Sequence, residues 1–350
     1  MPKITETELK KQLKTENLLR LYFLFGEEKY LVEYYAEELC KKAVGEADTS
    51  FNEHRLDGEA VTIDEIAETV DAMPLMANRK CVLVNNLDVD HLLAKETEKL
   101  NELLSDLPDF CVLIFCCRSL DINLKKSAKW KKFLAQIEKY GVSVELNKRG
   151  MIALEKQLVS WAKKLGKELS QINASKIIKL CGDDLLTLKN ELEKLCSFVG
   201  EGEITEQQID QIITKNLETT VFLLSKAVAA GEYKKAYRQL DLLFCQKEEP
   251  VAVLAVLSSL YTDMYRVRAA IESGKQLTDV SRTFDYRNKE FRLKNAQKDS
   301  SALSIQALRC CMDEILITDV ALKSTKVDKK ILMEKLLAKL MTVYKKEQHH

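Results

Sequence analysis

Apolar runs and helical periods alternate along the first 147 residues. Short apolar runs fit strands of a parallel sheet, which are buried on both faces. These runs are Leu21–Phe25, Phe51–Leu56, Cys81–Val84, Cys111–Cys116 and Val142–Leu146. Between them the spacing of apolar positions predicts helices at about 27–44, 62–73, 90–105 and 125–139. Strands that alternate with such helices predict βαβ units and a mostly parallel sheet covered on both faces.

The strand pattern stops after residue 150, and residues 151–214 predict four helices. Gly182-Asp183-Asp184 separates the second helix from the third, and Ser170 or Asn173 is the candidate N-cap of the second. Thr205 with Gln208 forms a capping box at the start of the fourth. This segment therefore has the pattern of a small helical domain.

The last segment is helical as well. Gly231 interrupts it, and Pro250 starts a long helix. Two long amphipathic helices follow at roughly 302–324 and 328–345, with Asp328 as N-cap of the second. We therefore expect an AAA+-like α/β domain over 1–147, a helical lid over 148–215 and a helical bundle over 216–346.

Composition supports a helix-rich globular chain, because hydrophobic residues make up 46% and glycine and proline number only 11 and 4. Lys+Arg and Asp+Glu balance at 54 each, so any DNA contact must come from a local basic face or from partners. The ten cysteines form no CxxC pair and lie in apolar or helical patterns, which is typical of a reducing cytoplasm. No apolar run approaches the roughly 20 residues of a membrane helix, so we expect no membrane partner.

The turn after Leu21–Phe25 stands where a nucleotide-binding fold carries its phosphate loop. Here a single Gly26 is followed by Glu27 and Glu28, whose charges would repel a triphosphate, and no GxxxxGK[ST] occurs. Asp88 follows the third strand without a second acid, so we interpret it as a turn former rather than a metal ligand. His54 and His91 lack partners at ligand spacing. We expect no catalytic site, cofactor or metal.

The segment Ala72–Lys80 is apolar where a connection would normally be polar. Met73, Leu75 and Met76 crowd around Pro74, which ends the preceding helix. Adjacent Leu and Met cannot both follow one inward-facing periodicity, so at least one should face solvent. Two interpretations stand: a loop packed onto its own core, or an exposed apolar plug for a partner's pocket.

A basic cluster covers Lys125, Lys126, Lys129, Lys131 and Lys132. A solvated helix face is the ordinary interpretation, and a stripe that contacts the DNA backbone is the alternative. Trp130, within the cluster, is expected to pack inward. Lys125, Lys126 and Lys129 are therefore the candidate DNA contacts.

Nearly the whole chain resembles the delta subunit family of the bacterial DNA polymerase III clamp loader. Five segments carry the resemblance: Leu24–Val32, the Phe51-Asn52…Leu56-Asp57-Gly58 segment, Ala72–Lys80, Gly182–Leu195 and the helical C-terminal part. Their order and spacing are together more specific than any one of them. The resemblance implies an AAA+-like fold without ATP hydrolysis, in which the C-terminal bundle is a collar.

The resemblance also implies a site and partners. Delta subunits bind the beta sliding clamp through a hydrophobic wedge and help to load it onto primed DNA, and the wedge falls here on Met73, Pro74, Leu75 and Met76. Met76 departs from the aromatic residue that is common at its position. The implied partners are the ATP-hydrolysing tau/gamma subunits and delta prime, joined through the collar in a pentamer, and primer-template DNA.

Two other functions remain as alternatives. One is a nucleotide-dependent enzyme, an ATPase or nucleotidyltransferase, with an atypical phosphate site. The other is a scaffold that binds an unrelated partner. ATP binding by the chain would distinguish the first from a clamp-opening subunit, and clamp binding would distinguish the second.

Overall fold

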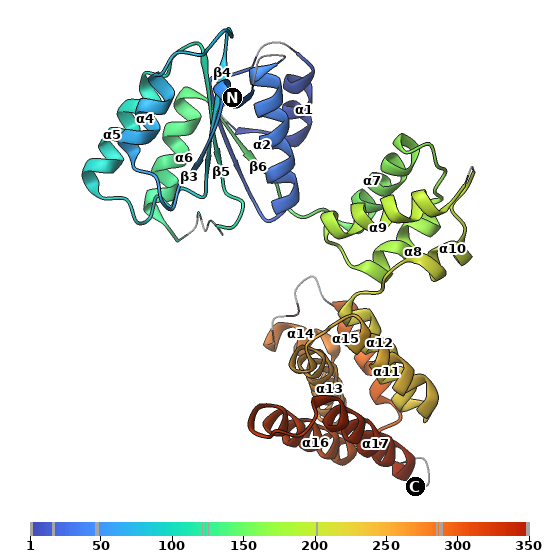
Figure 1. The fold of residues 1–350 in the computed structure, drawn as a ribbon. Coiled ribbons are helices and arrows are strands. Elements are labelled where there is room, and N and C mark those ends of the chain that lie inside the picture. The colour runs from blue at the N-terminus through green and yellow to red at the C-terminus, as the bar shows by residue number, and fades with distance from the viewer. Residues whose placement is uncertain are drawn as a thin grey trace. The chain divides into compact units, whose positions relative to one another are not determined.

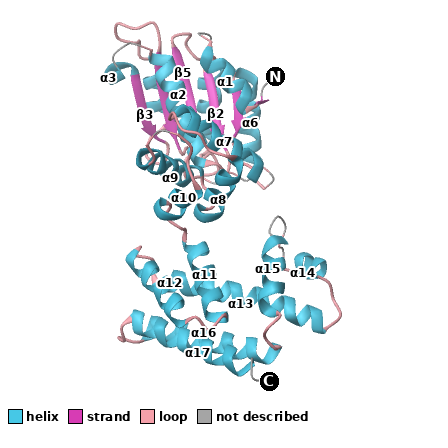
Figure 2. Cartoon of the chain, turned by 90° about the vertical axis from the view of Figure 1, so that its right-hand side faces the viewer, coloured by secondary structure: helices cyan, strands magenta, loops and turns pink. Residues whose placement is uncertain are grey.

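The computed structural model describes residues 3–15, 18–45, 49–120, 122, 124, 126–200, 202–284, 286 and 290–347. The chain divides into two compact units, Met1–Leu154 and Glu155–His350 (Figure 1). The first contains a six-stranded sheet, and the second is built from helices (Figure 2). The expected fold class, a parallel-sheet α/β unit followed by all-α segments, is confirmed. The finer division into lid and collar at residue 215 stays a prediction.

Every strand pairing in the first unit is parallel, and the spatial order is β1-β6-β2-β5-β4-β3. The strands are β1 (Lys3–Ile4), β2 (Leu21–Phe25), β3 (Glu53–Asp57), β4 (Lys80–Asn85), β5 (Cys111–Cys116) and β6 (Val142–Glu145). All residues of β2 and β5 are buried, as their unbroken apolar sequences require of central parallel strands. β3, at the edge, is only partly buried.

Helices cover both faces of this sheet (Figure 1). They are α1 (Glu6–Lys14), α2 (Lys29–Val44), α3 (Thr49–Asn52), α4 (Ile63–Asp71), α5 (Ala94–Ser105) and α6 (Ala128–Tyr140). α4, α5 and α6 share one core with alternate residues of β2, while α2 packs on β2, β4 and β5 from the other face. Trp130 is buried and stacks on Phe23 with ring centroids 6.0 Å apart, which confirms that it packs inward.

The sequence patterns missed two elements of this unit and misplaced the start of a third. No element was assigned before Leu21, yet β1 and α1 lie there, and α1 begins at a capping box formed by Thr5 and Glu8. A two-residue strand gives no readable alternation, and its place at the edge of the sheet depends on a tertiary pairing. We also predicted that the third strand begins at Phe51. Phe51 and Asn52 instead end the short helix α3, and β3 starts at Glu53.

The second unit begins with short helices whose capping follows the predicted signals. They are α7 (Met151–Lys164), which crosses from the first unit, α8 (Gln171–Cys181), α9 (Leu185–Phe198) and α10 (Glu206–Ile212). Ser170 is the N-cap of α8, because its hydroxyl accepts a hydrogen bond from the Asn173 amide. The predicted capping box of Thr205 and Gln208 is present at α10.

The remaining helices surround one continuous apolar core. They are α11 (Leu217–Ala229), α12 (Tyr233–Cys245), α13 (Pro250–Glu272), α14 (Leu277–Thr283), α15 (Glu290–Ser300), α16 (Ile305–Ser324) and α17 (Lys329–Glu347). Pro250 opens α13 as predicted. The Asp328 carboxylate accepts from the Lys330 amide at 2.7 Å, which confirms it as a cap of the last helix. No helix in the described part of the chain is long and apolar enough to cross a membrane.

The cysteines are mostly packing residues, with two exceptions. Cys116 and Cys117 are both buried. Of the adjacent Cys310 and Cys311, only Cys311 is buried, and Cys310 is exposed. Cys245 is exposed as well. Adjacent helical positions are about 100° apart, so a helix cannot turn both toward the core.

Candidate functional site

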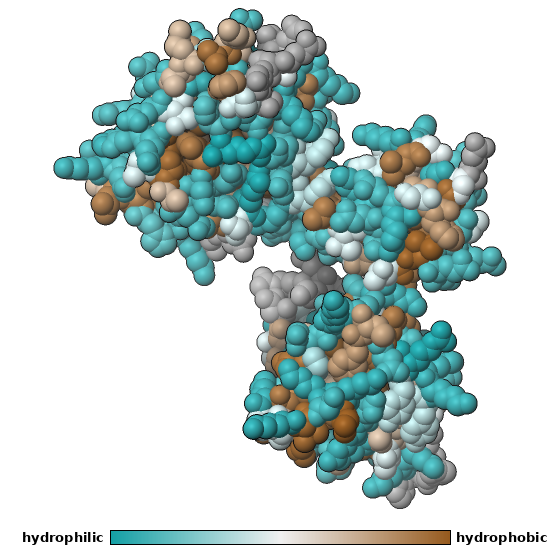
Figure 3. All heavy atoms as spheres, viewed as in Figure 1, coloured by the Kyte–Doolittle hydropathy of each residue, from teal (hydrophilic) through white to brown (hydrophobic). Residues whose placement is uncertain are grey.

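The loop between α4 and β4, residues 72–79, presents apolar side chains to solvent. Met73 is 78% exposed, Leu75 51% and Met76 98%. The prediction that at least one of them faces solvent is confirmed, and a loop packed onto its own core is excluded. Figure 3 shows apolar atoms gathered at the end of the α/β unit where Figure 1 places the start of β4. We refer to residues 72–79 as the apolar loop.

The chain enters this loop through a well-defined helix. α4 begins at a capping box of Thr62 and Glu65, and it buries Ile63, Ile66 and Val70 against the sheet. It ends at Asp71, because the fixed φ and missing amide hydrogen of Pro74 prevent its continuation. The apolar residues of the loop therefore lie beyond the end of the helix, and no helical face carries them into the core.

Asn52, the last residue of α3, holds the backbone of the loop. Its side chain is fully buried. Its Nδ2 donates to the carbonyl oxygen of Leu75 at 2.9 Å, and its Oδ1 accepts from the Leu75 amide at 2.9 Å. Both main-chain polar groups of Leu75 are thus bonded to one side-chain amide. The backbone of the loop is anchored at the residue whose side chain is exposed.

Lys80, the first residue of β4, holds the end of α4. It is 1% exposed, and its Nζ donates to the carbonyl oxygens of Thr69 and Ala72. Those carbonyls belong to the last turn of the helix and its cap, where a cation is favoured by the helix dipole. Burial lowers the pKa of Lys80, although Cys111 and Asp71 act in the opposite direction.

Sequence reasoning gave no role to Asn52 or Lys80. The available signal was a polar residue beside an apolar run: Asn52 after an aromatic residue, and Lys80 at the start of an all-apolar strand. Partners that are 23 and 8 residues away are fixed only by the tertiary fold.

Met76 has a backbone φ of 51°, in the left-handed region. A non-glycine residue in this region costs about 1–2 kcal/mol. The conformation turns the chain sharply next to Leu75 and leaves the Met76 side chain almost fully exposed. Such backbone strain is concentrated at functional sites in proteins.

The turn after β2 is packed shut. Gly26 has a φ of 139°, and a Cβ at this position would lie 2.1 Å from the carbonyl oxygen of Leu146. The Glu28 amide donates to the same oxygen at 2.9 Å, and Lys29 Nζ donates to the Leu120 carbonyl at 2.6 Å. In a phosphate loop, amide hydrogens and a lysine of this kind would face the anion. Here they bind the protein's own carbonyl groups.

Asp88 forms a turn, as predicted. Its Oδ1 accepts from the Asp90 amide at 3.0 Å. Its Oδ2 lies 2.7 Å from Nδ1 of His91, so the expectation that His91 has no acidic partner was wrong. Among the residues that the structure describes, no group of three or more His, Cys, Asp or Glu side chains could hold a metal ion.

The basic cluster is only partly available to a ligand. Lys125 lies outside the described residues, and Lys126 is exposed. Lys129 Nζ donates to the carbonyl oxygens of Asp90 and Leu92 at 2.6 and 2.9 Å, so its charge already stabilises the preceding loop. The predicted DNA contact of these lysines stays a prediction.

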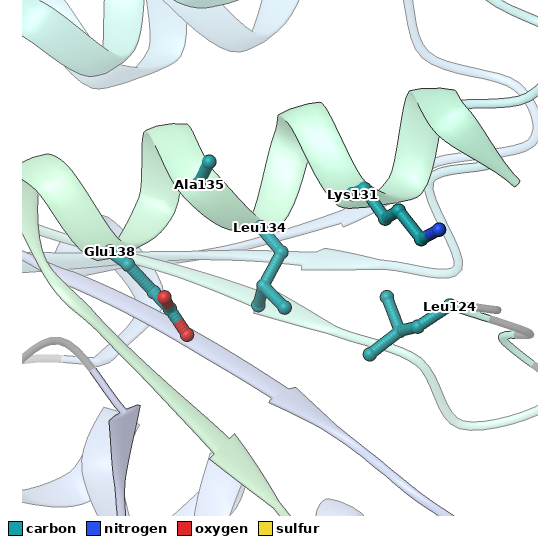
Figure 4. A pocket seen from close by; sticks show the side chains of 5 residues that line it. All are labelled: Leu124, Lys131, Leu134, Ala135 and Glu138. Carbon is teal, nitrogen blue, oxygen red and sulfur yellow. The ribbon is translucent and has the colours of Figure 1, made fainter.

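An open cavity of about 480 Å³ lies along α6 (Figure 4). Leu124, Lys131, Leu134, Ala135 and Glu138 line it, and the lysine and the glutamate lie toward its two ends with Leu134 between them. Its lining is mainly apolar and lacks the convergent polar groups that orient a substrate. We assign it no catalytic role.

Comparisons with known proteins agree with this architecture. Residues 22–143 match the family described as DNA polymerase III, delta subunit, and residues 218–340 match its C-terminal domain. DNA polymerase III subunit delta of Bacillus subtilis is 24% identical over 97% of this chain and 98% of its own. The corresponding subunit of Escherichia coli is 26% identical over 73% of each chain.

A solved structure has the same fold. The Bacillus subtilis DNA clamp loader delta protein superposes with a TM-score of 0.64 at 21% identity, covering 96% of this chain and 99% of its own. The two family matches include most of the sheet and most of the C-terminal helices, and the Bacillus subtilis relative covers 97% of this chain. The chain therefore belongs to the family of DNA polymerase III delta subunits.

Proposed function

We propose that this chain binds the beta sliding clamp through its apolar loop and helps to open the ring. Leu75 and Met76 are the anchors, and Met73 and Pro74 flank them. The observation that carries the proposal is that three large apolar side chains are exposed on a loop with an anchored backbone. When a partner's pocket removes such side chains from water, the free energy of the complex falls.

Ring opening requires differential binding. A wedge that binds the open ring more tightly than the closed ring shifts the population toward the open state by the ratio of the two affinities. The chain then needs no bond-making chemistry of its own, so we propose that it is not an enzyme. The packing of the turn after β2 supports this, because its amide and lysine donors are bonded internally.

The other partners join through the C-terminal helices in this proposal. Leu316, Ile317 and Val320 of α16 are 61%, 57% and 55% exposed, and their spacing places them on neighbouring parts of one helix surface. Such a surface suits contact with the ATP-hydrolysing tau/gamma subunits and delta prime. We propose that the assembly works on primer-template DNA in the bacterial cytoplasm.

Direct DNA contact is a separate and weaker proposal. Lys126 is an exposed candidate, and Nζ of Lys129 donates to two carbonyl groups. Each phosphate contact contributes about one unit to the slope of log affinity against log salt. A loader carrying Lys126→Ala should lose that contribution when its primer-template affinity is measured across salt concentrations. An unchanged slope would remove Lys126 from the interface.

The decisive experiment compares clamp binding by the native chain and a Leu75→Ala/Met76→Ala variant, using surface plasmon resonance without ATP. Truncation of an anchor residue costs about 2 kcal/mol or more, so the double variant should bind at least about 100-fold more weakly. Leu93→Ala is the control, because Leu93 is 70% exposed in the same unit. The control should bind like the native chain, and all three proteins should have the same thermal stability.

Other outcomes would redirect the proposal. Equal binding by the native chain and the double variant would move the contact away from the apolar loop. Absence of binding by the native chain would reject the clamp-opening role. Binding of Mg-ATP by the isolated chain, measured by calorimetry, would instead favour a nucleotide-dependent enzyme.

A further inference from the structure

We propose that Asn52 is a positioning residue that holds Leu75 and Met76 in their binding conformation before a partner arrives. The inference rests on the proposed function, because it assigns a role within the same site. Asn52 contacts the loop through its side-chain amide, and its own side chain is fully buried. It therefore acts on the loop from inside the protein and cannot itself be a contact residue.

The geometry of the two hydrogen bonds specifies what Asn52 does. A side-chain amide offers one donor and one acceptor side by side, and here they match the carbonyl and the amide of a single residue. The main-chain amide and carbonyl of Leu75 are hydrogen-bonded as they would be by a neighbouring β-strand, although Leu75 lies in a loop. The two bonds fix the orientation of the Leu75 backbone, and its side chain remains half exposed.

The neighbouring residues give this anchor a rigid base. Asn52 directly precedes β3, and Glu53 pairs with Cys81 of β4, the residue that follows Lys80. Lys80 holds the end of α4 from which the loop departs. The loop is thus fixed at its start by Lys80, the first residue of β4, and near its middle by Asn52, the residue before β3.

Anchoring matters because a partner binds only the fraction of molecules whose loop is already in the binding conformation. The apparent dissociation constant rises as that fraction falls. Met76 increases the need for an anchor, because its left-handed backbone is unfavourable without support. Loss of the two hydrogen bonds should therefore weaken clamp binding by about tenfold, with all apolar contact residues still present.

Two substitutions separate hydrogen bonding from packing. Asn52→Ala removes both bonds and most of the side chain. Asn52→Asp has nearly the same shape but places a carboxylate oxygen where the donor stood, facing the Leu75 carbonyl oxygen. If hydrogen bonding positions the loop, Asn52→Asp should bind at least as weakly as Asn52→Ala. If Asn52 only fills space, Asn52→Asp should bind like the native chain, and the proposal is wrong.

A control accounts for general destabilisation. Ser143→Ala, in β6 of the same unit and away from the loop, removes the hydrogen bond that the buried Ser143 hydroxyl donates to Glu138 of α6. It should leave clamp affinity unchanged even if it lowers the melting temperature. Equal loss of affinity in Ser143→Ala and Asn52→Ala at matched stability would overturn the positioning role.

Hydrogen exchange in the full-length chain tests the anchor without the clamp. The Leu75 amide should be protected in the native chain, and its exchange should become at least about tenfold faster in Asn52→Ala. An unprotected Leu75 amide in the native chain would overturn the inference whatever the clamp does. If the native chain fails to bind the clamp, the proposed function fails, while the exchange result still decides whether Asn52 anchors the loop. If only Leu75→Ala/Met76→Ala loses binding, the proposed function stands and the inference fails.

Discussion

The turn after β2 and the apolar loop before β4 are both connections of one parallel sheet, but they use their polar groups differently. In the turn, the Glu28 amide and the Lys29 ammonium bind carbonyl groups of other segments. In the apolar loop, the main chain of Leu75 is bound from inside by Asn52, and the side chains remain outside. The first arrangement bonds these polar groups internally, and the second leaves large apolar side chains exposed to solvent.

If the apolar loop binds the clamp as proposed, the fold keeps its architecture while binding takes place at another connection. A βαβ unit needs a tight turn after its first strand whether or not that turn binds phosphate. The packing of Gly26 against Leu146 satisfies the structural need alone. Changes at the turn should therefore affect stability, and changes at the apolar loop should affect binding.

The largest effect on the free energy of unfolding is expected at the turn after β2. Gly26→Ala would place a Cβ 2.1 Å from the Leu146 carbonyl oxygen at a φ unfavourable for alanine. Backbone strain and overpacking each cost about 1–3 kcal/mol, so the free energy of unfolding should fall by about 3 kcal/mol or more in urea titrations.

Gly45→Ala is the matched control for the turn. Gly45 ends α2 at a φ of 66°, with no atom within 4 Å of an added Cβ. Backbone strain should lower the free energy of unfolding of Gly45→Ala by only about 1 kcal/mol. If the free energy of unfolding falls equally in Gly26→Ala and Gly45→Ala, the turn is not tightly packed.

A charged cluster around Glu6 of α1 gives a pH-dependent effect of intermediate size on the free energy of unfolding. Glu6 accepts a hydrogen bond from the Tyr35 hydroxyl at 2.6 Å and pairs with Lys10 and Arg149. Burial tends to raise the pKa of Glu6, but the bonds from Tyr35 and Lys10 and the charge of Arg149 outweigh it and hold the pKa below 4.5. Glu6→Gln should cost about 1–2 kcal/mol of stability at pH 7, because the cluster is partly solvated.

The sign of the pH dependence follows from the lowered pKa. The ionised carboxylate stabilises the folded state above pH 4.5, and this contribution is lost as the pH falls through the folded-state pKa. The stability difference between the native chain and Glu6→Gln should therefore shrink below pH 4.5 in thermal unfolding. Glu27→Gln, at an exposed position of the turn, should change stability by less than about 0.5 kcal/mol. A difference that grows toward acid pH would contradict the role of Glu6.

The smallest change in stability is expected in the apolar loop, where stability and binding should move in opposite directions. Met76→Gly relieves about 1–2 kcal/mol of left-handed strain, offset by about 0.5–1 kcal/mol of added chain entropy in the unfolded state. The variant should be as stable as the native chain or up to about 1 kcal/mol more stable, yet bind the clamp more weakly.

Lys247→Gly is the control for Met76→Gly, because Lys247 has a similar φ of 59° in the second unit. It should gain similar stability in urea titrations and keep the native clamp affinity. If Met76→Gly also kept native affinity, Met76 would not be a contact residue.

Sequence patterns predicted the elements that depend on local information. The buried strands Leu21–Phe25 and Cys111–Cys116 have the predicted bounds, and Thr205, Asp328 and Pro250 begin their helices as expected. Patterns also indicated that at least one of Leu75 and Met76 faces solvent, but they left open whether the loop packs onto its own core. They missed β1, which exists only through its pairing with β6. They could not find the roles of Asn52 and Lys80, because each depends on where a distant carbonyl or amide comes to lie.

Asn52 recognises Leu75 only through main-chain atoms, which every residue type except proline provides. The attachment of the loop is therefore independent of the side chains that the loop displays. Substitutions at positions 73, 75 and 76 can follow changes in a partner's pocket over evolution while the framework beneath them stays the same.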